Sequence, residues 1–205
     1  SILGFAETML DHVDLNETSV YMVEAIKRNA ERLSTLFQEL LHLYRIEARE
    51  SDLPLERVEI DEMVREVVGD HQMEADRRNI EISIQESDSV WGMANVDAFP
   101  HIVGNLISNA VKYTPNGGWV RIQIRNEGKS ALLEVLDSGP GIDPAYRDKI
   151  FERFFRVDRG RARADGGTGL GLSIVKHLCR ASGADVGVNS VPGNGSLFWV
   201  KFPQG

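Results

Sequence analysis

Three scarcities in the 205-residue sequence narrow what this protein can be. Cys179 is its only cysteine, which excludes an intrachain disulfide framework and a zinc site built on several cysteines. No apolar run approaches the roughly 18 residues of a membrane-spanning helix, and no secretory signal is recognised. Bases are in the minority, with 23 Lys and Arg against 31 Asp and Glu. No nucleic-acid partner is therefore expected, and the chain is predicted to be soluble material of a reducing compartment.

Residues 1–50 have the pattern of an antiparallel helical hairpin. A first helix is predicted over Ile2–Leu10, a turn over 11–16, and a start of the second helix at Asn16 or Thr18. Apolar residues then recur at alternating steps of four and three, as Ile26, Ala30, Leu33, Phe37, Leu40 and Tyr44. A hairpin alone cannot bury this stripe, so dimerisation into a four-helix bundle is expected. Packing of the hairpin on its own C-terminal domain is the alternative.

The charged segment 47–57, which contains Pro54, is taken as a boundary before a second domain at 51–205. Helices and strands alternate after it. Helices are predicted over Asp61–Arg78, after a capping Asp97, and over Leu170–Ser182, where Gly183 would end the helix. Strands are predicted at 80–84, 90–96, 120–124, 132–136, 186–189 and 197–202. Because hairpins join several of the strands, the expected fold class is α+β, a two-layer sandwich with helices on one face of a mixed sheet.

Two glycine-rich loops could bring backbone close to a ligand. The stretch Asp137–Ile142 follows a buried strand, and the Asp137 carboxylate could accept a hydrogen bond from an amine such as that of adenine. Residues 166–172 hold four glycines ahead of a helix, where backbone N–H groups can form an anion site. An ordinary surface turn and a flexible hinge are the alternatives.

The predicted helix over 101–113 carries amides on an otherwise apolar background. Asn105, Asn109 and Lys112 are spaced to share one helix face. Asn is a middling helix former, so two of them here indicate a role. A carboxamide oxygen is a suitable ligand for Mg²⁺, and Lys112 could balance phosphate charge. The alternative is that both amides satisfy buried backbone groups.

Bases concentrate in one segment of this acidic chain. Residues 147–163 hold seven bases and three acids, which is the local reversal of charge that a polyphosphate site needs. The stretch 158–167 has almost no apolar residue and ends in glycine, so it is predicted to be a movable lid. A solvated loop that offsets acids elsewhere is the alternative.

In their order and context these motifs resemble the catalytic core of sensor histidine kinases of two-component systems. Residues 105–113 are similar to the N box of that family, 137–142 to its G1 box, 151–156 to its F box and 167–172 to its G2 box. The N-terminal hairpin is similar to the dimerisation and phosphotransfer domain, and residues 1–8 look most like phosphate-responsive members. The resemblance implies an ATP-binding sandwich of the Bergerat type.

The resemblance also implies residue roles. Asp137 would receive the adenine amine, Asn109 with Asn105 would hold Mg²⁺ against the phosphates of ATP, and Lys112 would contact phosphate. Tyr113 would lie beside the base. Arg163, or Arg159 or Arg161, would meet the terminal phosphate, with Phe154 and Phe155 anchoring the lid. The remaining nucleotide contacts would come from Gly139, Gly141, Ile142, Gly167, Thr168, Gly169, Leu170 and Gly171.

One part of the family pattern is missing. The phosphoacceptor lies in a His-Glu-Leu-Arg-Thr-Pro-like box, and none of the five histidines has that context. The chain is therefore expected to begin just past this box and to bind ATP without autophosphorylating. The implied partners are a response-regulator receiver domain and a second copy of the chain. The expected location is the cytoplasm, with a membrane reached only through upstream segments.

Two other functions remain open at this point. One is an ATPase of the same fold without histidine phosphotransfer. The other is a non-catalytic dimeric adaptor that docks a response regulator and uses no ATP; the intact glycine loops argue against it. Binding of a non-hydrolysable ATP analogue with Mg²⁺ separates these readings.

Overall fold

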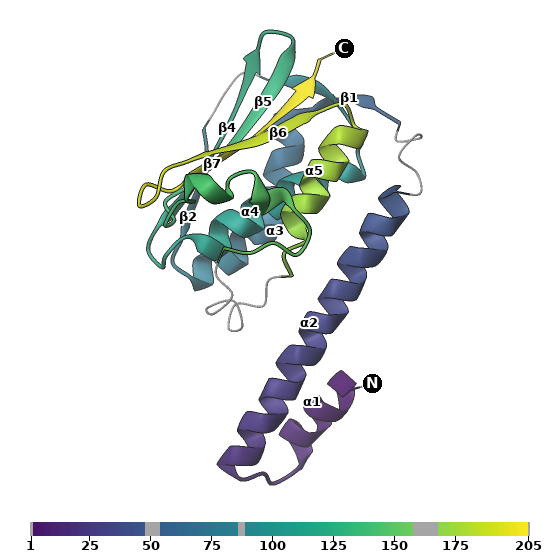
Figure 1. Cartoon of the computed structure of the whole chain (residues 1–205), viewed down its shortest axis with the longest axis vertical. Coiled ribbons are helices and arrows are strands. Elements are labelled where there is room, and N and C mark those ends of the chain that lie inside the picture. The colour runs from purple at the N-terminus through teal and green to yellow at the C-terminus, as the bar shows by residue number, and fades with distance from the viewer. Residues whose placement is uncertain (1, 48–53, 86–88, 158–167, 205) are drawn as a thin grey trace.

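The computed structural model describes residues 2–47, 54–85, 89–157 and 168–204, without several side chains between 32 and 47. The predicted hairpin consists of α1 (Ile2–His12) and α2 (Glu17–Glu47), with α1 folded back along the far end of α2 (Figure 1). At the start of α2, the Asn16 side chain accepts a hydrogen bond from the Ser19 N–H at 2.9 Å. Asn16 is therefore the capping residue of the two that the sequence offered.

The hairpin buries little apolar surface of its own. Ala6 on α1 and Val23 on α2 are buried between the helices, and Lys27 pairs with Glu7 at 3.5 Å. The described large members of the predicted stripe remain 50% to 63% exposed: Ile26, Leu33 and Phe37. Leu40 and Tyr44 lie outside the described side chains. The stripe is therefore left uncovered by α1.

A five-stranded mixed sheet forms the centre of the second part of the chain. Its strands are β2 (Glu81–Ile84), β4 (Trp119–Glu127), β5 (Ser130–Asp137), β6 (Asp185–Ser190) and β7 (Ser196–Pro203). They lie in the order β2-β4-β5-β7-β6, in which β2 and β4 are parallel and all other neighbours antiparallel. The predicted mixed sheet is confirmed. Because β5 and β7 pair antiparallel with Asp137 opposite Ser196, the end of β5 lies beside the start of β7.

A second, two-stranded sheet joins β1 (Glu56–Glu59) to β3 (Trp91–Ala94). The prediction had assigned residues 47–57 to a charged boundary and missed β1. Strand β1 is stabilised by tertiary contacts rather than by an apolar alternation, since the Arg57 guanidinium lies 5.2 Å from the centre of the Trp91 ring. Just after β1, the Asp61 carboxylate accepts a hydrogen bond from the Val90 N–H at 3.1 Å.

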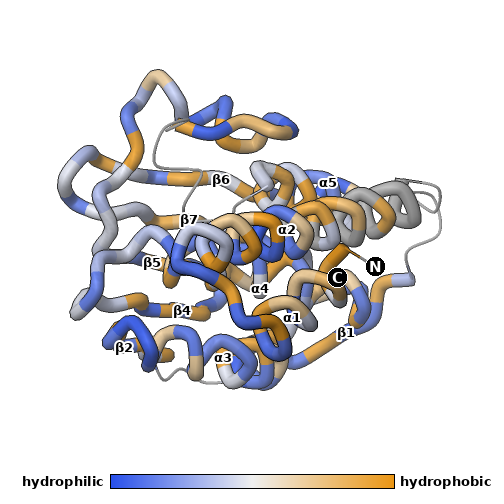
Figure 2. Tube along the Cα trace, turned by 90° about the horizontal axis from the view of Figure 1, so that it is seen from below, coloured by the Kyte–Doolittle hydropathy of each residue, from blue (hydrophilic) through white to orange (hydrophobic). Residues whose placement is uncertain are grey.

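Three helices cover one face of the large sheet (Figures 1 and 2). They are α3 (Ile60–Arg77), α4 (Ala98–Tyr113) and α5 (Gly171–Ala181). Each directs its apolar side chains toward the strands, and the rings of Phe99 on α4 and Phe202 on β7 lie 5.2 Å apart within the core. Burial of this shared face is the main source of stability.

The start of α4 differs from the prediction. Asp97 was expected to cap this helix, but its side chain makes no capping hydrogen bond. Asn95 does so instead, because its side-chain oxygen accepts from the Ala98 N–H at 2.9 Å and its carbonyl accepts from the Phe99 N–H at 2.9 Å. At the other end of the domain, Gly183 follows α5 with φ of 65°, as predicted for a C′ glycine.

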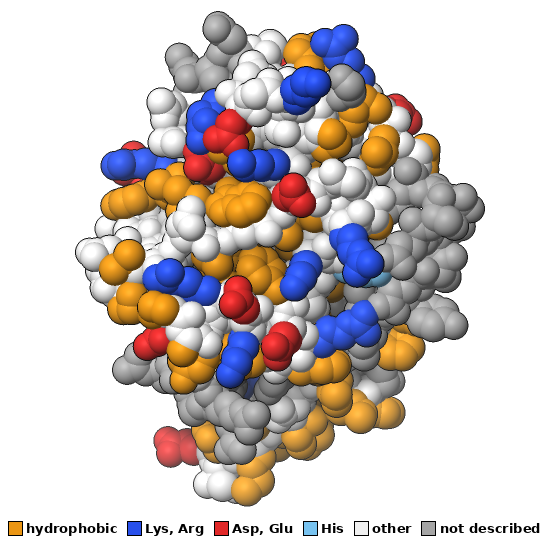
Figure 3. Space-filling view, turned by 45° about the horizontal axis from the view of Figure 1, so that its top comes forward, with side chains coloured by type: hydrophobic (Ala, Val, Ile, Leu, Met, Phe, Trp, Pro, Cys, Tyr) orange, Lys and Arg blue, Asp and Glu red, His pale blue; other side chains and the backbone are white. Residues whose placement is uncertain are grey.

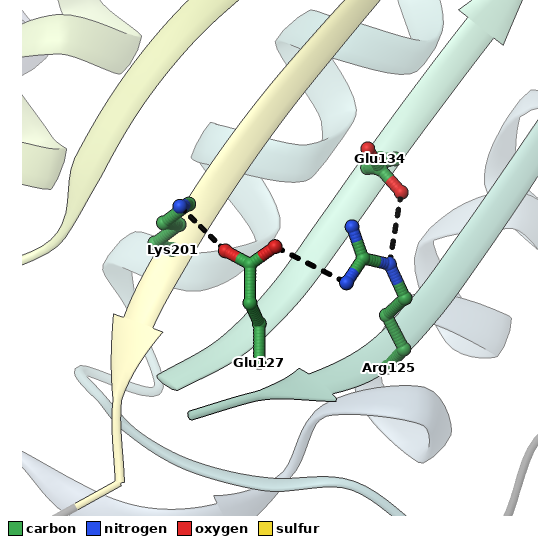
Figure 4. A network of polar contacts seen from close by, with 4 residues as sticks. All are labelled: Arg125, Glu127, Glu134 and Lys201. Atoms are coloured by element: carbon green, nitrogen blue, oxygen red, sulfur yellow. Dashed lines mark hydrogen bonds and ion pairs between the residues drawn. The ribbon is translucent and has the colours of Figure 1, made fainter. Parts of the chain in front are cut away.

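The opposite face of the sheet carries a chain of ion pairs (Figure 4). Lys201 lies 2.5 Å from Glu127, Glu127 lies 3.1 Å from Arg125, and Arg125 lies 3.4 Å from Glu134. The hydrogen bond from Lys201, with help from Arg125, lowers the pKa of Glu127 below its usual value. Acidic and basic side chains are intermingled on the face drawn in Figure 3. Exposed pairs of this kind add little stability, and their main effect is to keep the surface polar.

Candidate functional site

The N-box helix α4 presents its polar residues beside a fully buried apolar face. Ile102, Val103, Leu106 and Ile107 are buried against the sheet, whereas Asn105, Asn109 and Lys112 are half-buried. The helical period thus places the three polar residues at the edge of the core, as the spacing predicted. Within the described part of the chain, the Asn109 carboxamide makes no hydrogen bond. An amide in this position is open to a ligand.

Asn105 is held between two helices. Its side-chain nitrogen donates to the His101 carbonyl oxygen at 2.7 Å. Its side-chain oxygen faces the start of α5, where a β carbon added to Gly171 would lie only 2.5 Å away. The amide therefore fixes how closely α4 approaches α5, in addition to any role toward a metal ion.

The end of α4 carries a cation and an aromatic ring together. The Lys112 ammonium lies 5.6 Å from the centre of the Tyr113 ring, which is 52% exposed. A cation over an aromatic face is a favourable contact. The pair therefore offers a positive charge and a flat apolar surface on the same side of the helix end.

The G1 motif places a carboxylate at the end of central strand β5. Asp137 is only 6% exposed, and its side chain accepts a hydrogen bond from the Gly139 N–H at 2.8 Å. Burial raises the pKa of Asp137, while hydrogen bonds from the backbone of Gly139 and Ser196 act in the opposite direction. A buried acceptor held by two backbone donors is suited to receive an amine from a ligand.

The G1 glycines are required by close packing. A β carbon at Gly139 would lie 2.6 Å from the Asp137 carboxylate and 3.1 Å from the Tyr113 carbonyl oxygen. Gly141 has φ of 73°, and a β carbon there would overlap the Val191 carbonyl oxygen. The loop therefore lies against the end of α4 on one side and against the β6–β7 turn on the other.

The β6–β7 turn is a part of the site that the sequence analysis missed. Ser190 accepts a hydrogen bond from the Ile142 N–H at 2.8 Å and donates to the Gly195 carbonyl at 2.7 Å. Its hydroxyl also lies 3.0 Å from that of Ser196, and both serines are buried. The glycines that flank Asn194 are the available signal, but the strand predictions at 186–189 and 197–202 leave the segment between them without a role.

The described part of the G2 motif opens helix α5. The Thr168 hydroxyl accepts from the Leu170 N–H at 3.2 Å, and the Leu170 side chain is fully buried. Gly169 has φ of 77° and its carbonyl accepts from the Phe154 N–H at 2.9 Å. The predicted contacts at Gly167 and Arg163, and at Arg159 and Arg161, lie outside the described residues.

The two phenylalanines of the F-box segment have different environments. Phe155 packs against the core with its ring 5.9 Å from that of Tyr146, which belongs to the short helix η1 (Pro144–Tyr146). Phe154 has φ of 62° and a ring that is 59% exposed. Phe155 alone is therefore anchored in the way that was expected for both.

Three close approaches bring the motifs together. Gly171 of the G2 motif meets Asn105, Gly139 of the G1 motif meets the backbone of Tyr113, and Gly169 meets the backbone of Phe154. Segments that are far apart in sequence thus meet in pairs: the G1 loop lies against the end of α4, the start of α5 lies against the middle of α4, and Gly169 lies against Phe154. The polar groups that these segments bring are a buried carboxylate acceptor, two amides, an ammonium and glycine backbone, which are the groups expected for a nucleotide.

A metal ion at this site would need ligands from the nucleotide. No group of three or more His, Cys, Asp or Glu in the described ranges could hold a metal. Asn105 and Asn109 can supply amide oxygens, which Mg²⁺ accepts, and this ion usually completes its shell with phosphate oxygens and water. The residues present therefore fit Mg²⁺ that arrives with a polyphosphate, rather than a metal bound by the protein alone.

Gly171→Ala tests the contact between the two helices. The new methyl group would displace the Asn105 amide, and we expect nucleotide affinity to fall severalfold. The free energy of unfolding should change by less than about 1 kcal/mol, because the better helix propensity of Ala offsets the lost hydrogen bond from Asn105 to the His101 carbonyl. Gly69→Ala is the matched control, since Gly69 lies in α3 with nothing within 4 Å of an added β carbon. Calorimetric titration and thermal melts of both variants check this; equal affinities would contradict it.

Comparison with known families agrees with this arrangement. Residues 94–205 match the family described as histidine kinase-, DNA gyrase B-, and HSP90-like ATPase. Residues 1–49 match the His Kinase A (phospho-acceptor) domain. The first match contains the N-box, G1 and G2 segments, and the second contains the helical hairpin.

Individual relatives give the same result. The chain is 36% identical over 199 residues to the sensor-like histidine kinase SenX3 of Mycolicibacterium smegmatis, covering 97% of this chain and 52% of the relative. It is 37% identical over 202 residues to the phosphate regulon sensor protein PhoR of Pseudomonas aeruginosa, covering 98% and 46%. The chain therefore spans about half the length of the curated relatives that it matches.

A solved structure matches across the whole chain. Full-length ShkA in complex with AMPPNP superposes with a TM-score of 0.76 at 30% identity, covering 100% of this chain and 43% of ShkA. Among the described residues, every helix is too short or too polar to span a bilayer. Since the ATPase match covers more than half of the sequence and the phospho-acceptor match most of the rest, the chain belongs to the sensor histidine kinases of two-component systems, within the histidine kinase-, DNA gyrase B- and HSP90-like ATPase family.

Proposed function

We propose that this chain binds Mg-ATP and serves the transfer of the γ-phosphoryl group to a histidine, for relay to an aspartate of a response regulator. The observation that carries the proposal is the buried Asp137 at the end of β5, held by the Gly139 N–H in a loop whose glycines have no room for a side chain. In the transfer, a histidine nitrogen bonds to the γ-phosphorus, the bond from that phosphorus to the bridging oxygen breaks, and ADP leaves. Catalysis of such steps is mostly positioning and charge neutralisation.

Each end of the nucleotide has residues to receive it. Asp137 would accept the adenine amine, and Tyr113 would lie beside the base. Lys112 and Asn109 would take the phosphates, with Mg²⁺ supplying charge neutralisation when bound. Backbone N–H groups at the start of α5, near Gly169 and Gly171, would complete the phosphate contacts. The lid with Arg163 stays a prediction, because it lies outside the described residues.

The exposed stripe of the hairpin supports homodimerisation. The stripe formed by Ile26, Leu33 and Phe37 is uncovered in the single chain, and such a surface is buried when two hairpins form a four-helix bundle. The division into a hairpin at 1–50 and a catalytic domain at 51–205 is part of this proposal. Sedimentation of the chain at micromolar concentration, with Phe37→Glu as the comparison, measures whether the chain dimerises through this stripe.

The phosphoacceptor and the partner stay predictions. No histidine of this sequence stands in the family's acceptor context. The phospho-acceptor match over residues 1–49 supports a response regulator as the partner. The likeness to PhoR supports, as a weaker proposal, a phosphate-responsive system in the cytoplasm.

Titration of the chain with AMPPNP and Mg²⁺ tests the nucleotide proposal directly. We expect saturable binding at one site per chain, weaker binding of AMPPNP when Mg²⁺ is chelated, and no competition from GTP at equal concentration. Absence of binding would leave the non-catalytic adaptor as the better reading. Hydrolysis of ATP without labelling of a histidine in a chain that contains the acceptor box would favour the ATPase alternative.

Asn109→Ala tests the contribution of Mg²⁺ to AMPPNP binding separately from the contribution of the adenine base. The variant should lose the benefit of Mg²⁺, so that AMPPNP binds roughly tenfold more weakly in Mg²⁺, which corresponds to about 1.4 kcal/mol. Binding without Mg²⁺ should be unchanged. Ser108→Ala is the matched control, because Ser108 is exposed one residue away on α4. An unaltered Mg²⁺ effect in Asn109→Ala would remove the magnesium assignment.

A further inference from the structure

Arg78, at the end of α3, binds the end of the N-box helix. One terminal nitrogen of its guanidinium donates to the carbonyl oxygens of Val111 and Lys112, the latter at 2.8 Å. The other terminal nitrogen donates to the Thr114 carbonyl at 2.9 Å. One side chain of another helix therefore satisfies three carbonyls around the C-terminus of α4.

These carbonyls have no partner within their own helix. The last turn of any α-helix leaves its carbonyl groups unpaired, and they carry the negative end of the helix dipole. A guanidinium is suited to this place because its donors form a rigid fork and its charge opposes the dipole. Arg78 is half-buried, and its one side chain reaches all three carbonyl groups.

The segment that Arg78 holds is the one that faces the nucleotide. Lys112 and Tyr113 lie between the bonded carbonyls, and the Tyr113 carbonyl is the surface against which Gly139 packs. A shift of the α4 end would move the ammonium and the ring directly. It would also move the G1 loop, because that loop has no space for adjustment on this side.

A second contact extends from the same residue. The Arg78 carbonyl oxygen accepts from the Gly117 N–H at 3.3 Å, in the turn after α4. A β carbon at the next residue, Gly118, would overlap Thr114 and lie 2.6 Å from the Ser138 hydroxyl. That hydroxyl in turn accepts from the Trp119 N–H at 2.8 Å. The turn is thus packed between Arg78 and the G1 loop.

We propose that Arg78 is a positioning residue for nucleotide binding, acting through the end of α4 on Lys112, Tyr113 and the G1 loop. This inference rests on the proposed function. Arg78 lies about 60 residues before the G1 motif and in no nucleotide-binding motif of the sequence. Its effect is preorganisation: the nucleotide meets a helix end already fixed in place.

Arg78→Met, Arg78→Lys and Arg77→Met test the proposal in the full chain. Arg77 is the matched control because it makes the same change of charge one residue earlier. It is exposed, and among the described residues its side chain pairs only with Glu74 and Met73 on its own helix. Val68→Ala provides a second control, since it removes buried apolar volume from α3 and should lower stability without touching α4's end. The Kd of AMPPNP with Mg²⁺ is measured at a temperature where all variants are folded.

Arg78→Met is expected to bind about tenfold more weakly than the wild type, and Arg78→Lys to lie between, because one ammonium cannot span three carbonyls. Arg77→Met and Val68→Ala should bind like the wild type even where Val68→Ala melts as early as Arg78→Met. Equal affinities of Arg78→Met and Val68→Ala would overturn the positioning role while leaving the proposed function intact. A wild-type chain that fails to bind AMPPNP would instead overturn the proposed function, and the positioning role with it.

Discussion

Asp137→Asn is expected to weaken AMPPNP binding by about ten- to a hundredfold, the loss of one charge-assisted hydrogen bond at about 1.5–3 kcal/mol. The backbone N–H groups of Gly139 and Ser196 donate to this side chain, so the amide oxygen of the new Asn would point toward them. Its NH₂ group would then face the adenine amine, and two donors would meet. Guanine presents an acceptor at the same position, so discrimination against GTP should fall as well.

The same substitution should not destabilise the nucleotide-free protein at pH 7. Burial raises the pKa of Asp137, so the folded state disfavours the carboxylate that must exist at neutral pH. The resulting penalty is absent below the ordinary pKa and grows as pH rises through the raised one. Asn carries no such penalty. Thermal melts should therefore show Asp137→Asn at least as stable as the wild type at pH 7, with the difference shrinking as pH falls.

Asp143→Asn is the control for both effects. Asp143 lies in the same loop, is exposed, and accepts from the Ala145 N–H at 2.8 Å. Its variant should bind AMPPNP and exclude GTP like the wild type. An Asp137→Asn variant with unchanged affinity and unchanged discrimination would remove the adenine role of Asp137.

The parts of the fold that sequence predicts are those set by local periodicity. Helix α4 follows from the apolar spacing of Phe99, Ile102 and Leu106, and the amide pair of the N box follows from the same period. The mixed sheet follows from alternating strands joined by short turns, as at Gly128. In each case a few neighbouring residues decide the structure.

What sequence does not predict depends on residues that meet only in space. Strand β1 has no apolar alternation, and its pairing with β3 is made by residues more than 30 positions away. Asn95 rather than Asp97 is the cap because its side chain, two residues earlier, is the one that reaches the Ala98 N–H. Arg78 belongs to none of the nucleotide-binding motifs of the sequence. Its contribution exists only because α3 ends beside α4.

The β6–β7 turn gives the largest expected loss of stability, in Gly195→Ala. Gly195 has φ of 77°, which an alanine adopts at a cost of about 1–2 kcal/mol. A β carbon there would also overlap the Asp137 carbonyl oxygen, which is backbone at the end of β5 paired with β7 and cannot easily move aside. Overpacking adds about 1–3 kcal/mol. We expect the free energy of unfolding to fall by about 2–5 kcal/mol.

Gly193→Ala isolates the effect of the overlap. Gly193 lies in the same turn with φ of 84°, but nothing lies within 4 Å of an added β carbon. This variant should lose only the conformational term, about 1–2 kcal/mol, and should bind AMPPNP like the wild type. The folded fraction of Gly195→Ala should bind more weakly, because the displaced carbonyl belongs to Asp137, the residue that we propose receives adenine. Denaturant melts that give the two variants equal losses would show that the turn does not support Asp137, and the site would then depend on α4 and α5 alone.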